Sequence, residues 1–553
     1  MPLLLSCGGG SSSSTEPEVN LTEQQIKDLN TLTEGEITGF GSIYVNGVKY
    51  DTSDSKIFDD DDNSISESDL SVGMLVKLYG ELNSDDSTGS AHTIVYSPEI
   101  KGFIESLDLD LMTLSVHGQT IVFNDLTYFD DTTASALMLN DYIEVNGHLL
   151  DNGNLLATRI EKKSATDNIS IKGKVANLNT SEMQFTLGTL TIDYETAEFD
   201  KFTMADLADG QFVKVKGMFA NLAGDVFNVD KVKLYTFKPE DDHNHQHHYL
   251  NGVIADLQSD ISFMIGDVQV LTNSTTEVKY GSLDTLANNL PVKVKGDYNA
   301  DNQLIATKIY IVNQVILKAE GVIEDINAEL GTITVLGVTF IYNEFTRFDD
   351  DTEDDLHTFN DDSLNIGDYI EIKGYINTDG DNIASKISKD DEDDDSEEGN
   401  EFEGKVGSIS ENGFMMYGLN FTVNEDTEYE IYDVDASQQE FFAQLSEGML
   451  IEVKAIPDGD NYTVLEVEIE DEDDNQYSEQ ELEGQVSNIN NNGFTVSAMD
   501  IIVNENTTFV LYDIDVTKDE FFNQLTEGMY LKVKVMNSGE SYIALEVEIE
   551  DPG

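Results

Sequence analysis

The sequence is poor in cysteine, tryptophan, proline and basic residues. Its 553 residues include one Cys, no Trp, seven Pro and 30 Lys and Arg, against 109 Asp and Glu. A single Cys excludes an internal disulfide framework and a zinc site built from cysteines. The formal net charge of −79 excludes nucleic acid as a partner, because phosphate recognition needs clustered Lys and Arg.

Signatures of enzymes are also missing. The chain has no G-x-S-x-G, no P-loop, no H-E-x-x-H and no G-x-G-x-x-G that opens a helix. Acidic residues are so frequent that no pair of carboxylates points to acid–base catalysis. We therefore expect a protein that is not an enzyme. The lack of Trp also weakens a carbohydrate-binding interpretation, since sugar platforms usually use Trp, although exposed Tyr can substitute.

The amino terminus resembles a bacterial lipobox. Leu4-Leu5-Ser6-Cys7 is followed by a Gly/Ser-rich segment, which is typical of the flexible tether of a lipoprotein. The apolar stretch before Ser6 is shorter than a signal peptide requires, so we expect the true translation start to lie upstream. The resemblance implies lipidation of Cys7, attachment to the membrane through lipid alone, and a place in the bacterial outer membrane, which Gly8 favours over the inner one.

Internal repetition is the strongest signal in the chain. When residues 403–470 are aligned without gaps to residues 483–550, 32 of 68 positions are identical. Five weaker copies share the same skeleton. Each copy opens with a glycine before an alternating apolar run, and these glycines are Gly35, Gly102, Gly173, Gly252, Gly321, Gly404 and Gly484.

Each copy reads as a series of short strands. Apolar residues alternate with period two, as in a sheet with one face in water. A hairpin is predicted at Asn46-Gly47, because this dipeptide suits a type I′ turn, and six copies carry a glycine at this point. A G-x-x-V-x-V-x-G strand, such as Gly73–Gly80, follows a short helical segment that is clearest at Glu440–Leu445 and Glu520–Leu525.

Three strands, a short helix and two strands in about 70 residues are too few for an immunoglobulin sandwich. They fit a small closed barrel of the oligonucleotide/oligosaccharide-binding (OB) type. Closure is favoured because open five-stranded sheets would leave two exposed edges in every copy. The predicted fold is all-β, with tandem OB-like five-stranded barrels that each contain one short helix.

The same skeleton, together with terminal strands such as Leu155–Ile160 and Leu304–Ile309, resembles the family called domain of unknown function 5666, which occurs in tandem in proteobacterial lipoproteins. The shared motifs are structural glycines and apolar positions. The resemblance therefore implies a fold and export from the cytoplasm, and it implies no catalytic residue.

The predicted organisation comprises a tether, seven repeats and three linkers. The boundaries are 1–33 (lipobox remnant and tether), 34–98, 99–162 and 170–238 (repeats 1 to 3), 239–249 (His-rich linker), 250–312 and 318–388 (repeats 4 and 5), 389–400 (acidic linker), 401–470 (repeat 6), 471–480 (acidic linker) and 481–553 (repeat 7). Acidic linkers repel themselves and extend, so the chain is expected to form a long articulated rod of independent beads.

Two groups of residues are candidate metal ligands. The linker carries His243, His245, His247 and His248 beside carboxylates, and neutral imidazole is a good ligand for zinc; without a fixed geometry, adventitious binding or none is the competing interpretation. The remaining histidines, His92, His117, His148 and His357, are expected at the surface.

Acidic residues after an aromatic residue recur at the end of the third strand. They include Asp59, Asp60, Asp349 and Asp350, and runs of aspartate oxygens suit calcium. No EF-hand loop is present. The alternative interpretation is that the aromatic residue anchors the strand end while the acids are solvated and favour the start of the short helix.

The sequence therefore favours a non-enzymatic, lipid-anchored envelope protein that serves as an acidic stalk or binding scaffold. Its only expected attachment is the membrane through Cys7, and the sequence names no protein or glycan partner. A calcium- or zinc-binding protein is the first alternative, and accessory carbohydrate-binding modules are the second. No cofactor is certain.

Overall fold

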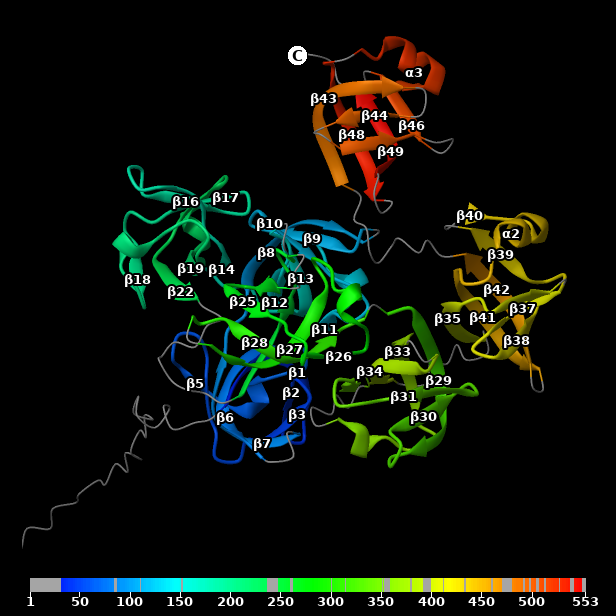
Figure 1. Cartoon of the computed structure of the whole chain (residues 1–553), viewed down its shortest axis with the longest axis horizontal. Helices are drawn as coiled ribbons and strands as arrows, with labels where there is room; N and C mark the ends of the chain where they lie inside the picture. The colour runs from blue at the N-terminus through cyan, green and yellow to red at the C-terminus, as the bar shows by residue number, and fades with distance from the viewer. Residues whose placement is uncertain are drawn as a thin grey trace, which may run out of the picture.

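The computed structural model describes residues 31–83, 87–109, 111–150, 153–235, 247–258, 262–299, 301–313, 315–350, 352, 359–377, 380–390, 399–410, 412–431, 434–458, 461–469, 480–490, 493–496, 499–503, 507–511, 514–526, 528–537 and 542–549. Cys7, His243, His245 and His357 lie outside these residues. Strands dominate the chain (Figure 1), and the all-β prediction is confirmed.

Repeat 1 is a closed barrel. Its elements are β1 (Thr31–Gly39), β2 (Ile43–Val45), β3 (Val48–Asp51), β4 (Lys56–Phe58), β5 (Ser64–Ile65), the 3-10 turn η1 (Glu67–Asp69), β6 (Leu75–Leu82) and β7 (Thr88–Tyr96). Strand β1 pairs with β2, β2 with β3, β3 with β7, β7 with β6, and β6 again with β1. Within this ring only the pairing of β3 with β7 is parallel, and β4 lies outside the ring as a further parallel neighbour of β7. The ring has no free end, as expected for an OB-like barrel.

The other repeats use the same elements. Repeat 2 has β8 (Ile100–Asp108), β9 (Thr113–Val116), β10 (Gln119–Val122), β11 (Tyr128–Asp130), η2 (Ala134–Ala136), β12 (Tyr142–Leu149) and β13 (Leu155–Lys162). Repeat 3 has β14 (Asn168–Lys174), β15 (Ala176–Asn179), β16 (Gln184–Leu187), β17 (Leu190–Asp193), β18 (Glu198–Asp200), η3 (Met204–Asp206), β19 (Phe212–Met218), η4 (Phe219–Asn221), β20 (Leu222–Ala223), β21 (Val226–Asn228) and β22 (Lys231–Tyr235).

Repeats 4 and 5 follow. Repeat 4 has β23 (His247–Val253), β24 (Ser262–Ile265), β25 (Val268–Leu271), β26 (Glu277–Lys279), η5 (Leu283–Thr285), β27 (Pro291–Tyr298) and β28 (Leu304–Ile311). Repeat 5 has β29 (Leu317–Asn327), β30 (Thr332–Val335), β31 (Val338–Ile341), β32 (Arg347–Asp350), η6 (Asp361–Ser363), β33 (Tyr369–Ile376) and β34 (Asn382–Lys389).

Repeats 6 and 7 contain the two α-helices of the described residues. Repeat 6 has β35 (Asn400–Lys405), β36 (Ser408–Ser410), β37 (Gly413–Met416), β38 (Leu419–Thr422), β39 (Glu428–Ile431), β40 (Val434–Asp435), α2 (Gln438–Gln444), β41 (Leu450–Asp458) and β42 (Asn461–Ile469). Repeat 7 has β43 (Gln480–Asn490), β44 (Gly493–Val496), β45 (Met499–Ile502), β46 (Thr508–Leu511), β47 (Ile514–Val516), α3 (Lys518–Gln524), β48 (Tyr530–Asn537) and β49 (Tyr542–Ile549).

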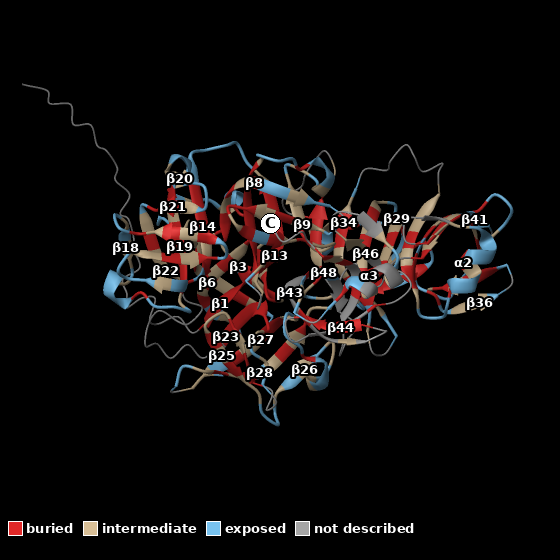
Figure 2. Ribbon diagram, turned by 90° about the horizontal axis from the view of Figure 1, so that it is seen from above, coloured by how far each residue is buried: buried red, intermediate tan, exposed pale blue. Residues whose placement is uncertain are grey.

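The helical prediction holds at both places where it was clearest, and repeats 1 to 5 reduce the element to a 3-10 turn. In repeat 6, Phe441 of α2 is fully buried and packs on Tyr429. Repeat 7 repeats this arrangement with Phe521 and Phe509. Apolar side chains fill the inside of each barrel, and the cores of repeats 5 and 6 are continuous with each other (Figure 2).

The recurring glycines have steric causes. A Cβ on the opening Gly35 would lie 2.4 Å from the side chain of Asn46. Asn46 precedes the hairpin glycine, and its side chain packs against Gly35. The hairpin residues Asn46 and Gly47 both have positive φ, as a type I′ turn requires. A Cβ on Gly80 would lie 2.2 Å from the backbone oxygen of Ser90, where the β6–β7 register shifts.

The repeats do not form a rod of independent beads. We call the strand that carries the opening glycine the opening strand and the G-x-x-V-x-V-x-G strand the closing strand. Opening strands join the barrels in pairs: β1 runs parallel to β23, β8 antiparallel to β14, and β29 antiparallel to β35. Repeats 1 and 4, 2 and 3, and 5 and 6 therefore share sheets.

The pairs also interlock. Thr158 of repeat 2 donates a hydrogen bond to the Gly73 oxygen of repeat 1 at 2.7 Å, and Arg347 of repeat 5 forms a 2.7 Å ion pair with Glu36 of repeat 1. Repeats 1 to 6 are thus joined in one body. Among the described residues, β43–β49 pair only with one another, and Figure 1 draws this barrel away from the body.

Two opening strands begin well before the predicted repeat boundaries. Strand β1 starts at Thr31 and β23 at His247, inside the segments expected to be tether and linker. The residues before these two opening glycines pair with the closing strand of their own barrel and with each other across the junction. Within the described part of the chain, no helix has the length and apolar character needed to cross a bilayer.

Candidate functional site

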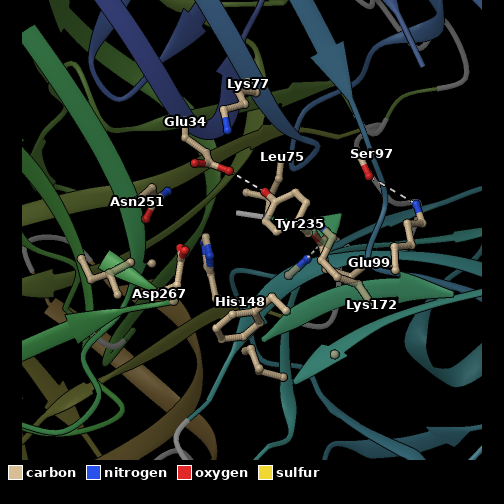
Figure 3. Close-up of a pocket in the computed structure, with 18 of the residues that line it drawn as sticks. Glu34, Leu75, Lys77, Ser97, Glu99, His148, Lys172, Tyr235, Asn251 and Asp267 are labelled. Carbon is tan, nitrogen blue, oxygen red and sulfur yellow. Dashed lines mark hydrogen bonds and ion pairs between the residues drawn. The ribbon is translucent and has the colours of Figure 1, made fainter. Parts of the chain in front are cut away.

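A cavity of about 830 Å³ lies where repeats 1 to 4 meet. Its walls include Glu34 and Leu75 from repeat 1, His148 from repeat 2, Tyr235 from repeat 3 and Asn251 from repeat 4. Figure 3 shows these side chains converging from separate strands. A volume of this size suits a drug-sized or oligomeric solute, and no single barrel provides it.

The cavity is rich in lysine although the chain is not. Six of the 30 Lys and Arg residues line it, namely Lys77, Lys172, Lys174, Lys201, Lys214 and Lys233. Six acidic residues also line it, namely Glu34, Asp60, Asp62, Glu99, Asp256 and Asp267. The formal charges of these twelve residues cancel, so the cavity is a balanced region inside a strongly anionic chain.

Ion pairs between repeats hold one wall. Lys214 is 2 % exposed; its Nζ lies 2.6 Å from an Asp60 oxygen and donates to the backbone oxygen of Pro98 at 2.7 Å. Lys216 lies 3.0 Å from the same carboxylate. Although burial opposes ionisation, these two ammonium groups hold the pKa of Asp60 well below its usual range. Lys172 pairs with Glu99 at 2.5 Å.

Glu34 is one of two cavity-lining residues, with Thr93, that have a buried side-chain oxygen without a hydrogen-bond partner among the described residues. It is 8 % exposed, and burial raises the pKa of its carboxyl. The Tyr235 hydroxyl donates to Oε1 of Glu34 (Figure 3), while Oε2 has no hydrogen-bond partner. A buried acceptor without a donor is destabilising, so a ligand that donates a hydrogen bond here would remove a penalty.

His148 and Asn251 line both this cavity and a smaller pocket of about 100 Å³. His148 is 7 % exposed. Burial, together with the nearby charges of Arg347 and Lys293, lowers its pKa to about 3. The imidazole therefore stays neutral at physiological pH and offers one donor and one acceptor.

The smaller pocket contains an unpaired buried ammonium. Lys293 is 6 % exposed, and its Nζ lies 4.6 Å from the ring centre of Phe345. None of the hydrogen bonds or ion pairs of the described residues reaches this Nζ. Burial lowers the pKa of Lys293 to about 8. Arg347 enters the same pocket, and one oxygen of Glu36, Oε1, is unpartnered there.

Two of the four candidate histidine ligands belong to a strand. His247 and His248 belong to β23, and His248 is 4 % exposed with its ring 4.5 Å from that of Tyr298. His243 and His245 lie outside the described residues.

The expectation that His117 and His148 are at the surface is wrong, because they are 2 % and 7 % exposed. Both are buried by contacts between repeats or strands that are distant in the sequence and that the sequence alone does not predict.

The four candidate aspartates have other partners. Asp59 caps its own loop, accepting from the backbone N–H of Asp61 and Asn63. Asp60 pairs with Lys214 and Lys216. In repeat 5, Asp349 lies 3.4 Å from Lys386, and Asp350 accepts from the Thr352 hydroxyl. In the described ranges, no three His, Cys, Asp or Glu side chains are grouped so that they could hold a metal ion.

The residues that define the cavity were not identified from the sequence. Glu34 of the cavity and Lys293 of the smaller pocket follow the pattern of solvent-exposed residues on alternating strands. The available signal was the uneven distribution of lysine. Lysines are scarce overall, yet they concentrate on repeat 3, for example at Lys172, Lys214 and Lys216, which implies acidic partners on neighbouring barrels.

Comparisons with known proteins place the chain in a family. A search of curated proteins found no match. The solved structure of Drosophila Unr CSD456 is 14% identical and is matched over 99% of its length and 44% of this chain, with a TM-score of 0.13. The model of the family Domain of unknown function (DUF5666) matches residues 34–94, 101–161, 172–223, 251–310, 320–388, 403–470 and 483–548. These seven matches cover well over half of the chain, and the protein belongs to this family.

Proposed function

We propose that this protein is a non-enzymatic, lipid-anchored envelope protein whose first five repeats form a binding scaffold. The observation that carries the proposal is the cavity of about 830 Å³ between repeats 1 to 4. An extended stalk needs no shared cavity, so the interlocked body favours a binding role over a purely mechanical one.

The unsatisfied groups define the chemistry of the ligand. Oε2 of Glu34 lacks a donor, and no ion pair of the described residues reaches the ammonium of Lys293, although Glu36 and Glu344 lie near enough to favour its charge. A polar solute with hydroxyl or amino donors and one carboxylate complements both, and sugar acids and amino acids have this chemistry. The carboxylate would lie in the smaller pocket beside Lys293 and Arg347, and the polar body would lie past His148 in the larger cavity.

Calorimetry tests this binding. Sodium glucuronate should bind the full chain more tightly than glucose, and Lys293→Met should weaken glucuronate about 10- to 100-fold, as expected for a hydrogen bond to a charged group. Lys295→Met is the matched control, because Lys295 lies on the same strand and lines neither pocket. Equal affinity of the two variants, or no carboxylate binding by the natural chain, contradicts the ligand assignment.

A tryptophan reporter locates the ligand. The chain has no Trp, so Leu75→Trp places the only Trp of the variant in the cavity wall (Figure 3). Its emission should change on titration with sodium glucuronate. Leu139→Trp, at a position that is 57 % exposed, should give no response. If only the Leu139→Trp variant responded, the ligand would bind outside the cavity.

Lipid attachment rests on the lipobox-like Leu4-Leu5-Ser6-Cys7. Cells fed a radiolabelled fatty acid should label the natural chain and not Cys7→Ser, with both chains expressed behind the same added signal peptide. Labelling of both chains, or of neither, contradicts the anchor. This outcome is independent of ligand binding.

A further inference from the structure

The antiparallel junctions between barrels share one register. Ile100 stands opposite Ile171, and Ala319 stands opposite Phe402. Each of these residues lies two positions before the opening glycine of its repeat. Both junctions are therefore nearly two-fold symmetric. In each, the residue three positions before the opening glycine of one strand faces the residue one position before the opening glycine of the other strand, as Lys318 faces Glu403.

The barrel topology explains why this edge is used. Within its own barrel, the first half of an opening strand pairs only with the closing strand, as 317–322 pairs with β33. The second half pairs only with the next strand, as 323–327 pairs with β30. The first half therefore keeps a second edge of backbone donors and acceptors, and such edges are sites for pairing with another strand. Repeats 1 to 6 all cover this edge with an opening strand.

Repeat 7 has the same edge without a cover. Residues 480–485 of β43 pair with β48, and residues 486–490 pair with β44. Within the described ranges, no strand pairs with the other side of 480–485. Seven opening strands form three pairs, and β43 is left over.

We propose that a second copy of this chain covers the edge, with the two β43 strands antiparallel and Leu482 opposite Leu482. This is the register of the two antiparallel junctions carried over to repeat 7. A two-fold antiparallel pairing is self-complementary, so it closes as a dimer and leaves no further edge for growth.

The charges favour a second copy over an unrelated basic strand. In repeat 7, Glu481 stands opposite Lys534, and Glu483 stands opposite Lys532. The position of Lys532 is occupied by Glu452 in repeat 6. In the junction of repeats 5 and 6, the eight equivalent positions hold three Lys and five Glu: Lys318, Glu320, Glu371, Lys373, Glu401, Glu403, Glu452 and Lys454. The proposed dimer has four Lys and four Glu at these positions.

Sedimentation equilibrium of the full chain tests the proposal. We expect a reversible dimer with a dissociation constant of about micromolar order. The residue before the opening glycine donates outward, since the Lys172 N–H donates to the Glu99 oxygen across a junction at 2.8 Å. Glu483→Pro removes the corresponding donor, and proline is tolerated on edge strands. This variant should be monomeric, while Glu483→Ala, which keeps the N–H, should still dimerise.

A charge variant provides a second test that remains valid if Glu483→Pro misfolds. Lys532→Glu installs the residue that repeat 6 already tolerates and should weaken the dimer about tenfold through like-charge contacts. Lys518→Glu, on α3, makes the same change of charge away from the edge and should have no effect. A natural chain that stays monomeric at about 100 times the expected constant, or a dimer that Glu483→Pro and Lys532→Glu both leave intact, overturns the proposal.

Discussion

Repeats 6 and 7 share 32 of 68 aligned residues and yet have different neighbours. Both form the same barrel, with a seven-residue helix over the core. Strand β35 of repeat 6 is covered by repeat 5, whereas β43 has no such cover in the described residues. The barrel is thus specified by glycines and apolar positions, and its neighbours are specified by a few outward residues.

Lys318 shows what these outward residues do. Its ammonium lies 3.3 Å from Glu401, 3.4 Å from Glu371 and 3.8 Å from Glu320, and these carboxylates raise its pKa against the effect of burial. Tyr417 adds a hydroxyl that contacts the backbone oxygen of Glu403. Repeat 7 has Ser497 in place of Tyr417 and Lys532 in place of Glu452.

The largest expected effect is a cavity in the shared core. Phe402 is fully buried against Phe421 and Tyr462, so Phe402→Ala should lower the free energy of unfolding by about 3–5 kcal/mol. Hydrogen exchange should show this loss in repeats 5 and 6 together. Phe494→Ala, at a residue that is 2 % exposed in repeat 7, should affect repeat 7 alone. If Phe402→Ala left the exchange of repeat 5 unchanged, the shared sheet would not couple the two barrels.

A smaller effect is expected from the junction charge. Lys318→Met leaves three carboxylates facing one another and should cost about 2 kcal/mol, less than a fully buried pair because Lys318 is partly exposed. Urea denaturation of the repeat 5–6 unit measures it. Lys405→Met, at an exposed lysine of the same unit, is the control. Equal losses in the two variants would show that Lys318 is not the residue that joins the barrels.

The junction should also respond to pH. Burial, with Asp125 and Glu452 nearby, raises the pKa of Glu403 to about 7. Between the ordinary value of 4.5 and this raised value, the folded state binds more protons at Glu403 than the unfolded state does. Stability contributed by this group is therefore lost as the pH rises through that window. The melting temperature of repeats 5 and 6 should fall between about pH 5 and about pH 8, and Glu452→Lys should reduce the fall. An unchanged slope in Glu452→Lys would contradict this origin.

The smallest effect concerns a feature that the two repeats share. Ser437 caps α2: its Oγ accepts from the Glu440 N–H at 3.3 Å, and its own N–H donates to the Glu440 carboxylate at 3.0 Å. Repeat 7 has Thr517 and Glu520 at the same positions. Ser437→Ala and Thr517→Ala should each cost about 1 kcal/mol in thermal unfolding. A large difference between them would mean that the barrels differ inside as well as at their edges.

Much of the barrel could be predicted from the sequence, and little of the assembly could. Asn46-Gly47 and Glu440–Leu445 carry local signals, since backbone conformation and helical spacing depend on neighbouring residues. Contacts between barrels depend on residues such as Glu34 and Lys214, which alternate with core positions in the same way as solvated residues do. Their burial arises from segments more than a hundred residues away in the sequence, and the local residue pattern does not predict such long-range contacts.

The parallel junction of β1 with β23 also has a consequence for synthesis. Thr31 pairs with His247, and 247 − 31 gives 216 residues that must be made between the two strands. At about 5–20 residues per second, β1 waits about 10–40 s for its partner. During that interval one edge of β1 in the nascent amino-terminal barrel stays unpaired. Electrostatic repulsion between the anionic nascent chains of one polysome would lower the risk that such edges pair and aggregate.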